Sequence, residues 1–170
     1  MKFFSKLIII IFFTSFSSLH LSANDKTAFI NVEYIIQNSN IGKKVLKNIN
    51  DLNKKNINQL EKKNKILKDL ETSIKNKKNI ISEKDFNDEV KAFQKKIQDL
   101  TKEKNTIVKE FNNFRKVELE KILKLFNPII SNYMKENSVN ILIDSKNIFM
   151  GSSGSNLTEN ILKKINEEIK

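Results

Sequence analysis

The side chains that most often carry catalysis are almost absent from this 170-residue chain, which has no cysteine and one histidine, His20. Histidine ordinarily titrates near neutral pH, and activated thiols and hydroxyls are the common nucleophiles. Because His20 falls in a segment that we expect to be removed on export, the mature chain can form neither a Ser-His-acid nor a Cys-His arrangement. We therefore expect a protein that is not an enzyme and holds no metal.

Two further patterns could carry chemistry, and both have simpler interpretations. Carboxylates are adjacent at Asp88-Glu89 and Glu167-Glu168, but neighbouring residues on a helix point in different directions, which favours solvent-facing charge. Residues 151–155 have the Gly and Ser content of a phosphate-binding loop without its Gly-Lys-Ser/Thr ending. We expect a flexible connection there and no cofactor.

The N-terminus has the layout of a secretory signal peptide. Lys2 and Lys6 precede an almost wholly apolar run, residues 7–16, and a Ser-rich stretch leads to Ala23. An apolar run of about ten residues is too short for a spanning helix, which needs about 20. The sequence therefore predicts export and cleavage near Ala23, and the lack of cysteine excludes a lipoprotein anchor.

The elements that follow are predicted to be long helices, because only 3 glycines and 1 proline interrupt the chain. Residues 43–78 contain neither and repeat apolar residues at heptad spacing, with polar gaps at Asn53, Asn56 and Lys63. Residues 86–114 alternate steps of four and three with one charged interruption, Lys104. Ser82 and Asp85 resemble the start of a new helix, so the chain is predicted to turn back near residues 76–82.

Short strands are predicted outside this helical hairpin. Residues 27–32, 139–144 and 148–150 are rich in β-branched and aromatic side chains. Pro128 is expected to kink or break the second arm, and residues 157–169 read as an amphipathic helix capped by Asn156 or Thr158. Because so few short strands are marginal alone, we expect one sheet completed by other copies of the chain.

The positive charge is concentrated on the hairpin. Residues 42–135 carry 24 Lys and Arg against 13 Asp and Glu, a net charge of +11, whereas the mature head carries 5 against 7. Such a rod could attract nucleic acid, anionic lipid or acidic polypeptide, or its lysines could simply solvate the helices. Export disfavours nucleic acid.

The order of several motifs resembles the Skp/OmpH family of periplasmic chaperones. The first group runs from Lys26 to Val32, with Ile35-Ile36 and residues 39–43 opening the first arm. The second group lies near the C-terminus and comprises Pro128-Ile129, Glu136-Asn137, residues 139–144 and residues 157–162. The chain departs from the family pattern at Asn156, where an acidic residue is common, and in the polar gaps of the first arm.

The resemblance implies a mainly α chain with a small β head, in which a long antiparallel coiled-coil hairpin stands on a β body completed by trimerisation. The expected division is a signal peptide at 1–23, a head at 24–41 and 137–170, and an arm at 42–136. The implied function is that of an ATP-independent periplasmic holdase, which binds unfolded outer-membrane proteins and prevents their aggregation. The partners would be these clients and two further copies of the chain, with contact to anionic lipid or lipopolysaccharide left open.

Two sets of residues are candidates for these contacts. Client capture is assigned to charged and apolar arm residues: Lys75, Lys77, Lys78, Lys84, Leu52, Ile57, Ile66 and Ile80. Oligomerisation is assigned to apolar strand residues of the head: Phe29, Ile30, Ile141, Ile143 and Phe149. The second-arm residues Phe86, Phe93, Ile97 and Leu100 fit the hairpin seam by spacing, although part of them could face a client. The competing functional class is a structural or adaptor coiled coil of the cell envelope.

Overall fold

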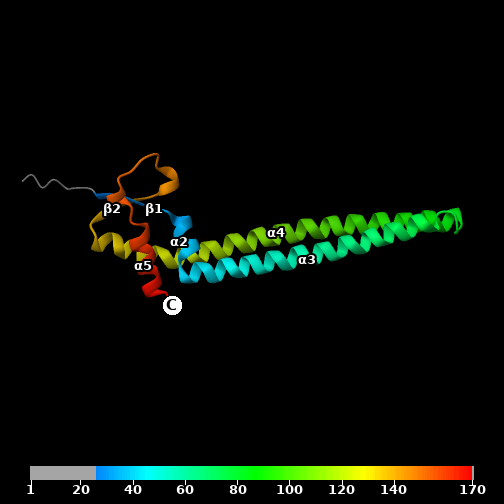
Figure 1. Cartoon of the computed structure of the whole chain (residues 1–170), viewed down its shortest axis with the longest axis horizontal. Helices are drawn as coiled ribbons and strands as arrows, with labels where there is room; N and C mark the ends of the chain where they lie inside the picture. Colours follow the sequence, from blue (N-terminus) through cyan, green and yellow to red (C-terminus); the bar gives the residue numbers. More distant parts are fainter. Residues whose placement is uncertain (1–25, 170) are drawn as a thin grey trace, which may run out of the picture.

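The computed structural model describes residues 26–169, so the predicted signal peptide and His20 lie outside the described residues. Figure 1 shows a small head from which two long helices extend side by side. The elements, in chain order, are β1 (Lys26–Ile30), α2 (Val32–Asn38), α3 (Asn40–Lys77), α4 (Glu83–Glu136), β2 (Val139–Asp144), the 3₁₀ turns η1 (Ser145–Asn147) and η2 (Ser153–Ser155), and α5 (Thr158–Glu168). The prediction of a mainly helical chain with a small β head is confirmed.

The head is built on a parallel pair of strands from opposite ends of the described chain. β1 pairs with β2, with Phe29 opposite Ile143. On the other edge of β1, Asn156 forms an isolated bridge to Phe29, and the Leu157 amide donates to the Phe29 carbonyl at 2.9 Å. The predicted joining of N- and C-terminal strand segments in one sheet is confirmed.

The predicted strand at 148–150 is wrong. After β2, the Asp144 carboxylate accepts a hydrogen bond from the Lys146 amide at 3.3 Å, and the chain turns through η1. The Ile148 amide then donates to the Ser145 carbonyl at 3.1 Å, which closes the turn. This local capping directs residues 148–150 away from the sheet, and Asn156 takes the place beside β1.

The core lies where the sheet meets α2, the C-terminal part of α4 and α5. Its best buried side chains are Ile35, Ile122, Phe126, Ile161 and Ile165, each at most 1% exposed. Burying an aliphatic or aromatic side chain of this size contributes about 1.5–3 kcal/mol. The predicted apolar face of the C-terminal helix therefore faces the core. The N-cap position of α5 is Leu157 and not the predicted Asn156 or Thr158, but the Asn156 side-chain oxygen accepts a hydrogen bond from the Thr158 amide, the first of the helix, at 3.0 Å.

Pro128 does not break the second arm, so the predicted break is wrong, while the kink expected as its alternative stays a prediction. α4 runs unbroken through it for 54 residues, from the tip of the arm into the head. Proline removes one backbone donor and crowds the preceding turn. Here Phe126 and Ile129, 1% and 6% exposed, anchor the helix in the core on both sides of the exposed proline. Burial of these neighbours keeps the helix continuous.

The chain leaves α4 through a left-handed residue. Ser138 has φ of 53°, and the Asn137 side-chain amide donates to the Tyr133 carbonyl at 2.8 Å. These features end the helix after Glu136 and turn the chain into β2. Among residues 26–169, no helix combines the length and apolar character needed to cross a bilayer.

Candidate functional site

The root of the arm is a tight elbow between α2 and α3. The buried Ser39 hydroxyl accepts a hydrogen bond from the Gly42 amide at 3.2 Å and so caps α3. A Cβ at Gly42 would lie 1.8 Å from the Ile36 carbonyl oxygen, so the two helices approach as closely as they do only with glycine here. Asn166 of α5 accepts from the Asn40 amide at 2.8 Å. The first turn of α3 is therefore tied to the head on two sides.

The seam of the arm follows the register expected for its first helix at all but one position. Along α3 the buried and half-buried side chains step by three and four residues: Ile49, Leu52, Asn56, Leu60, Lys63, Leu67, Leu70 and Ile74. Asn53, expected to interrupt the seam, is exposed, and Leu52 takes the seam position instead. Leu52, which was assigned to client capture, is thus a half-buried residue of the seam.

The charged interruption of the seam is an ion pair across the two helices. Lys63 Nζ lies 2.6 Å from Glu103 Oε1, and Gln59 Nε2 donates to the same oxygen at 2.9 Å. The hydrogen bond from Lys63 lowers the pKa of Glu103, although partial burial acts in the opposite direction. Lys104, expected to interrupt the second helix, is exposed, while its neighbour Glu103 is half-buried. The polar seam residue of each helix therefore has a hydrogen-bonding and charged partner on the other helix.

The tip of the arm is a short turn with a capped exit. The Ser82 hydroxyl accepts from the Asp85 amide at 3.2 Å and donates to the Asp85 carboxylate at 2.6 Å. The predicted helix start at Ser82 is thus confirmed. Ile80, within this turn, is 79% exposed.

The four candidate lysines near the tip are not equivalent. Lys77 lies 2.8 Å from Glu89 across the hairpin, and Lys75 lies 2.7 Å from Glu71 on its own helix. Lys78 and Lys84 are exposed. Charge at Lys75 and Lys77 is therefore already partly compensated, which leaves Lys78 and Lys84 as the stronger candidates for contact with an anionic partner.

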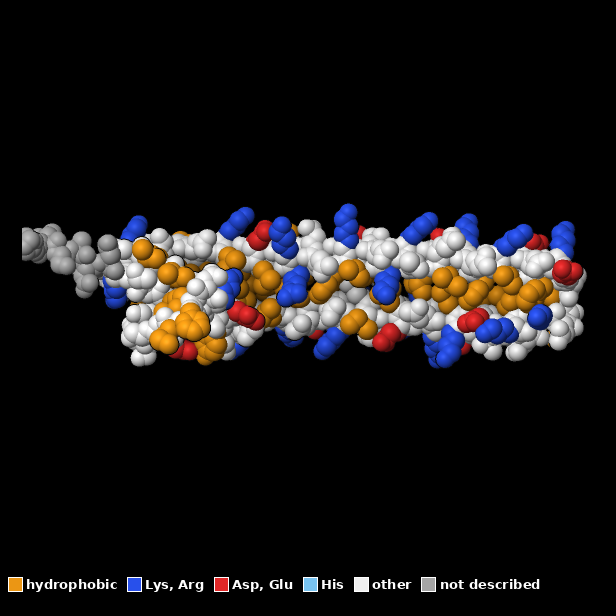
Figure 2. Space-filling view, turned by 90° about the horizontal axis from the view of Figure 1, so that it is seen from above, with side chains coloured by type: hydrophobic (Ala, Val, Ile, Leu, Met, Phe, Trp, Pro, Cys, Tyr) orange, Lys and Arg blue, Asp and Glu red, His pale blue; other side chains and the backbone are white. Residues whose placement is uncertain are grey.

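Apolar side chains are exposed along the sides of the arm. Three of the four apolar capture candidates belong to this group, with Ile57 46%, Ile66 64% and Ile80 79% exposed. On α4, Val108, Val117 and Leu125 are exposed as well and were not among the candidates, whereas Ile97, which the sequence left open as a seam or client residue, is 42% exposed. Val108 and Val117 lie off the heptad positions, as Ile57 and Ile66 do, so the same criterion applied to the second arm would have found these two. Figure 2 shows hydrophobic side chains along much of the junction between the two helices.

The head surface exposes only part of the predicted oligomer contact. Phe149 is 101% and Ile141 51% exposed, whereas Phe29 and Ile143 are half-buried. Ile30 is 4% exposed in the core of its own chain, because alternate residues of β1 face inward. Ile30 is therefore not on the surface of this chain. Met150, 83% exposed beside Phe149, was not among the candidates.

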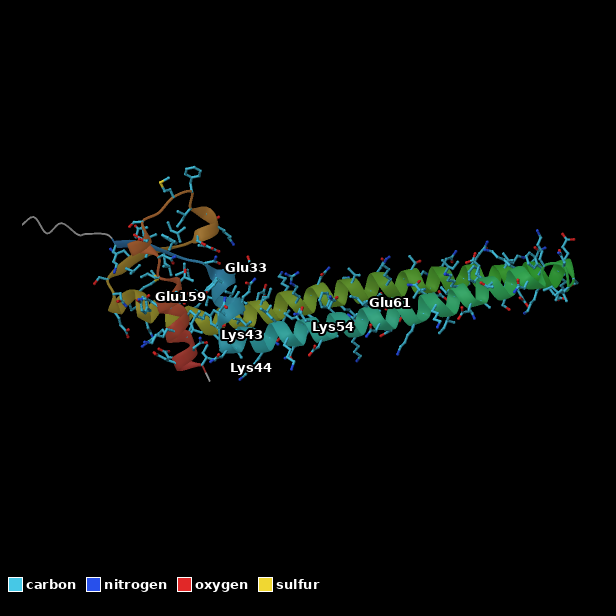
Figure 3. The ribbon with its side chains drawn as sticks, in the orientation of Figure 1. Glu33, Lys43, Lys44, Lys54, Glu61 and Glu159 are labelled. Atoms are coloured by element: carbon cyan, nitrogen blue, oxygen red, sulfur yellow. The ribbon has the colours of Figure 1, made fainter. Side chains whose placement is uncertain are left out.

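Charged side chains lie on the head and along the first part of α3. Figure 3 shows Glu33 and Glu159 on the head, Lys43 and Lys44 where α3 begins, and Lys54 and Glu61 farther along it. The Glu159 carboxylate beside the Tyr34 hydroxyl raises the pKa of Tyr34 and links α2 to α5. Within residues 26–169, no cluster of His, Cys, Asp or Glu side chains is arranged to hold a metal ion.

Comparison with known proteins gives one family and one fold. A protein-family model described as outer membrane protein (OmpH-like) matches residues 26–165. Among solved structures, one from Caulobacter crescentus CB15, described as an OmpH-like outer membrane chaperone, is similar with a TM-score of 0.75 and 14% identity. The likeness covers 85% of this chain and 86% of that chain, and at this identity it establishes the fold alone. No curated protein sequence matches the chain.

Proposed function

Because the chain belongs to the OmpH-like family, we propose that it is an ATP-independent holdase chaperone of the periplasm, which binds unfolded outer-membrane proteins and prevents their aggregation. The observation that carries this proposal is the arm. It is a long projection with apolar side chains exposed along its sides and an excess of lysine. At 1.5 Å per residue, the 54 residues of α4 extend over about 80 Å, far beyond what a head of this size needs.

The arrangement suits reversible binding without nucleotide energy. Singly exposed residues such as Ile57, Ile66 and Ile80 each offer a small contact, and many weak contacts on one client give a high effective concentration. The excess lysine charge would speed the approach of acidic clients, and salt would screen that attraction. Binding is thus expected to be fast, multivalent and easily released.

We propose further that three copies join through their heads, so that three arms surround a client. The described sheet has two strands, which leaves β2 as an edge strand, and such edges are usually covered. Ile141, in that strand, and Phe149 and Met150, shortly after it, are exposed apolar side chains. A charged residue at the half-buried Ile143 should lower the mass of the mature protein in sedimentation to that of a monomer. A parent protein that is itself a folded monomer at micromolar concentration would refute the trimer.

The proposed maturation removes residues 1–23 and leaves a head formed by 24–41 and 137–170 with an arm at 42–136. Sequencing of the N-terminus of protein recovered from the cell envelope should give Asn24 or a neighbouring residue. An intact Met1 on cytoplasmic protein would contradict both export and the periplasmic location.

A second candidate function is that of a rigid adaptor in the envelope. The ion pairs Lys63–Glu103 and Lys77–Glu89 favour it, because they join the two helices and so stiffen the arm. A stiff arm suits an adaptor better than a protein that must bend around its client. An adaptor would hold two partners apart without binding unfolded chains.

One experiment separates the two functions. An unfolded outer-membrane β-barrel protein is diluted from urea into buffer with mature protein, without nucleotide, and light scattering reports aggregation. A holdase should keep the barrel protein soluble at low salt and protect it less, without losing protection, at high salt. Unchanged aggregation at low salt would reject the holdase and favour the adaptor.

A further inference from the structure

One side of the distal arm carries a groove between the two long helices. The groove has a volume of about 380 Å³, and its apolar lining comes from both helices: Leu60, Leu67, Phe93, Ile97 and Leu100. Ile97 has the spacing of a seam residue, yet it is 42% exposed in the structure. The seam is therefore incompletely closed here, and apolar surface remains open to solvent within reach of a partner.

The length of the groove matches a short stretch of extended polypeptide. Its lining on α3 runs from Leu60 to Glu71, about 17 Å at 1.5 Å per residue. An extended chain rises about 3.3 Å per residue, so about five residues would fit. Because successive side chains of an extended chain point to opposite sides, alternate residues would enter the groove and the others would face solvent.

The rim of the groove selects the charge of what enters. Lys68 on α3 and Lys104 on α4 border it, with Glu71 as the acidic residue on the same rim. Lysines bordering apolar surface favour apolar side chains flanked by Asp or Glu, and disfavour flanking Lys. Two of these three charged rim groups are cationic, one from each helix.

From this geometry we infer that the groove is a binding subsite for extended segments of an unfolded client in which apolar side chains alternate with polar or acidic ones. The inference rests on the proposed holdase function, and it names the part of the arm and the kind of segment that meet. Strands of membrane barrels have this alternation, because one side faces lipid and the other the interior.

The test compares two matched variants of the mature protein. Ile97→Gln places a polar side chain in the groove, whereas Val108→Gln makes the same kind of change outside it, on the same helix, at a residue that is 47% exposed. Affinity for a urea-unfolded outer-membrane barrel protein is measured by fluorescence titration. Loss of the part of the Ile97 side chain that a client would cover should weaken binding about fivefold. Val108→Gln should weaken binding clearly less than Ile97→Gln does, because it removes one isolated apolar contact outside the groove.

A second measurement holds even if Ile97→Gln disturbs the arm. A photo-cross-linking residue at position 68 or at position 109 of the parent is irradiated with two synthetic peptides of equal composition, one with alternating and one with clustered apolar residues. The inference predicts that the alternating peptide is captured preferentially at position 68. Equal affinity of the two Gln variants, or equal capture of the two peptides, would overturn it while the holdase stands. Failure of the parent to bind the barrel protein would instead reject the holdase and the subsite with it.

Discussion

Gly42→Ala should be among the most damaging single substitutions in the chain, although alanine is the better helix former. An added Cβ would lie 1.8 Å from the Ile36 carbonyl oxygen, and real Cβ atoms stay at least 3.0 Å from such atoms. The elbow would have to open by about 1.2 Å against the Ile36 backbone, and the Ser39 hydroxyl oxygen, 2.6 Å from the added Cβ, would have to move as well. Overpacking of this kind costs about 3 kcal/mol, whereas the gain in helix propensity is at most about 1 kcal/mol. The clash therefore outweighs the propensity.

The assay is thermal unfolding followed by circular dichroism at fixed protein concentration. A loss of about 2–3 kcal/mol corresponds to a decrease in Tm of about 4–12 °C for a chain of this length. The other two glycines provide controls. At Gly154 the nearest atom to an added Cβ is 3.8 Å away, and at Gly151 the close atom belongs to the Phe29 ring, which can move. If Gly42→Ala and Gly154→Ala have the same Tm, the elbow is not the tight contact described.

Three further outcomes are expected. Ser138→Gly should stabilise the protein by about 0.5–1 kcal/mol in denaturant unfolding, because the left-handed φ of 53° costs a non-glycine residue more than glycine's extra chain entropy; a loss of stability would contradict this. Because the folded pKa of Glu103 is lowered, its contribution is present at neutral pH and disappears as pH falls through that pKa. The Tm advantage of the parent over Glu103→Gln should therefore shrink in acid, and a constant difference would refute the pairing. Reversing the tip charges should slow client capture at low salt without changing the oligomeric mass, and most of the effect should come from Lys78 and Lys84, with little from Lys75 and Lys77; an unchanged capture rate would exclude steering by the tip.

The elements that could be predicted are those governed by local pattern. The 3.5-residue spacing and the scarcity of glycine and proline gave two long helices, and Ser82 with Asp85 marked the start of the second. The pairing of the terminal strand segments followed from the need of short strands for partners. In each case the deciding interaction lies within a few residues or is required by any fold of these elements.

The errors arose where a distant contact decides. Pro128 is retained in α4 because Phe126 and Ile129 are buried on either side of it, which no local rule reveals. The seam of α3 steps by three residues from Ile49 to Leu52, where a step of four to Asn53 was expected. Lys63 pairs with Glu103 of α4, a partner that the sequence of its own helix does not reveal. Residues 148–150 are the exception, because a local contact decides there: they have strand composition, but the Asp144 cap turns the chain before they can pair.

The parallel pairing of β1 with β2 also sets an order of folding. The paired strands are separated by more than a hundred residues, and contacts so distant in sequence form slowly because a large loop must close first. The α3–α4 hairpin, by contrast, can form from the Ser82 turn outward, because each new contact between the helices lies next to one already made. Its closure brings the roots of both helices together, so the loop that the sheet must close becomes short. We therefore expect the arm to fold before the head, and β1 to pair with β2 only after α3 and α4 have come together.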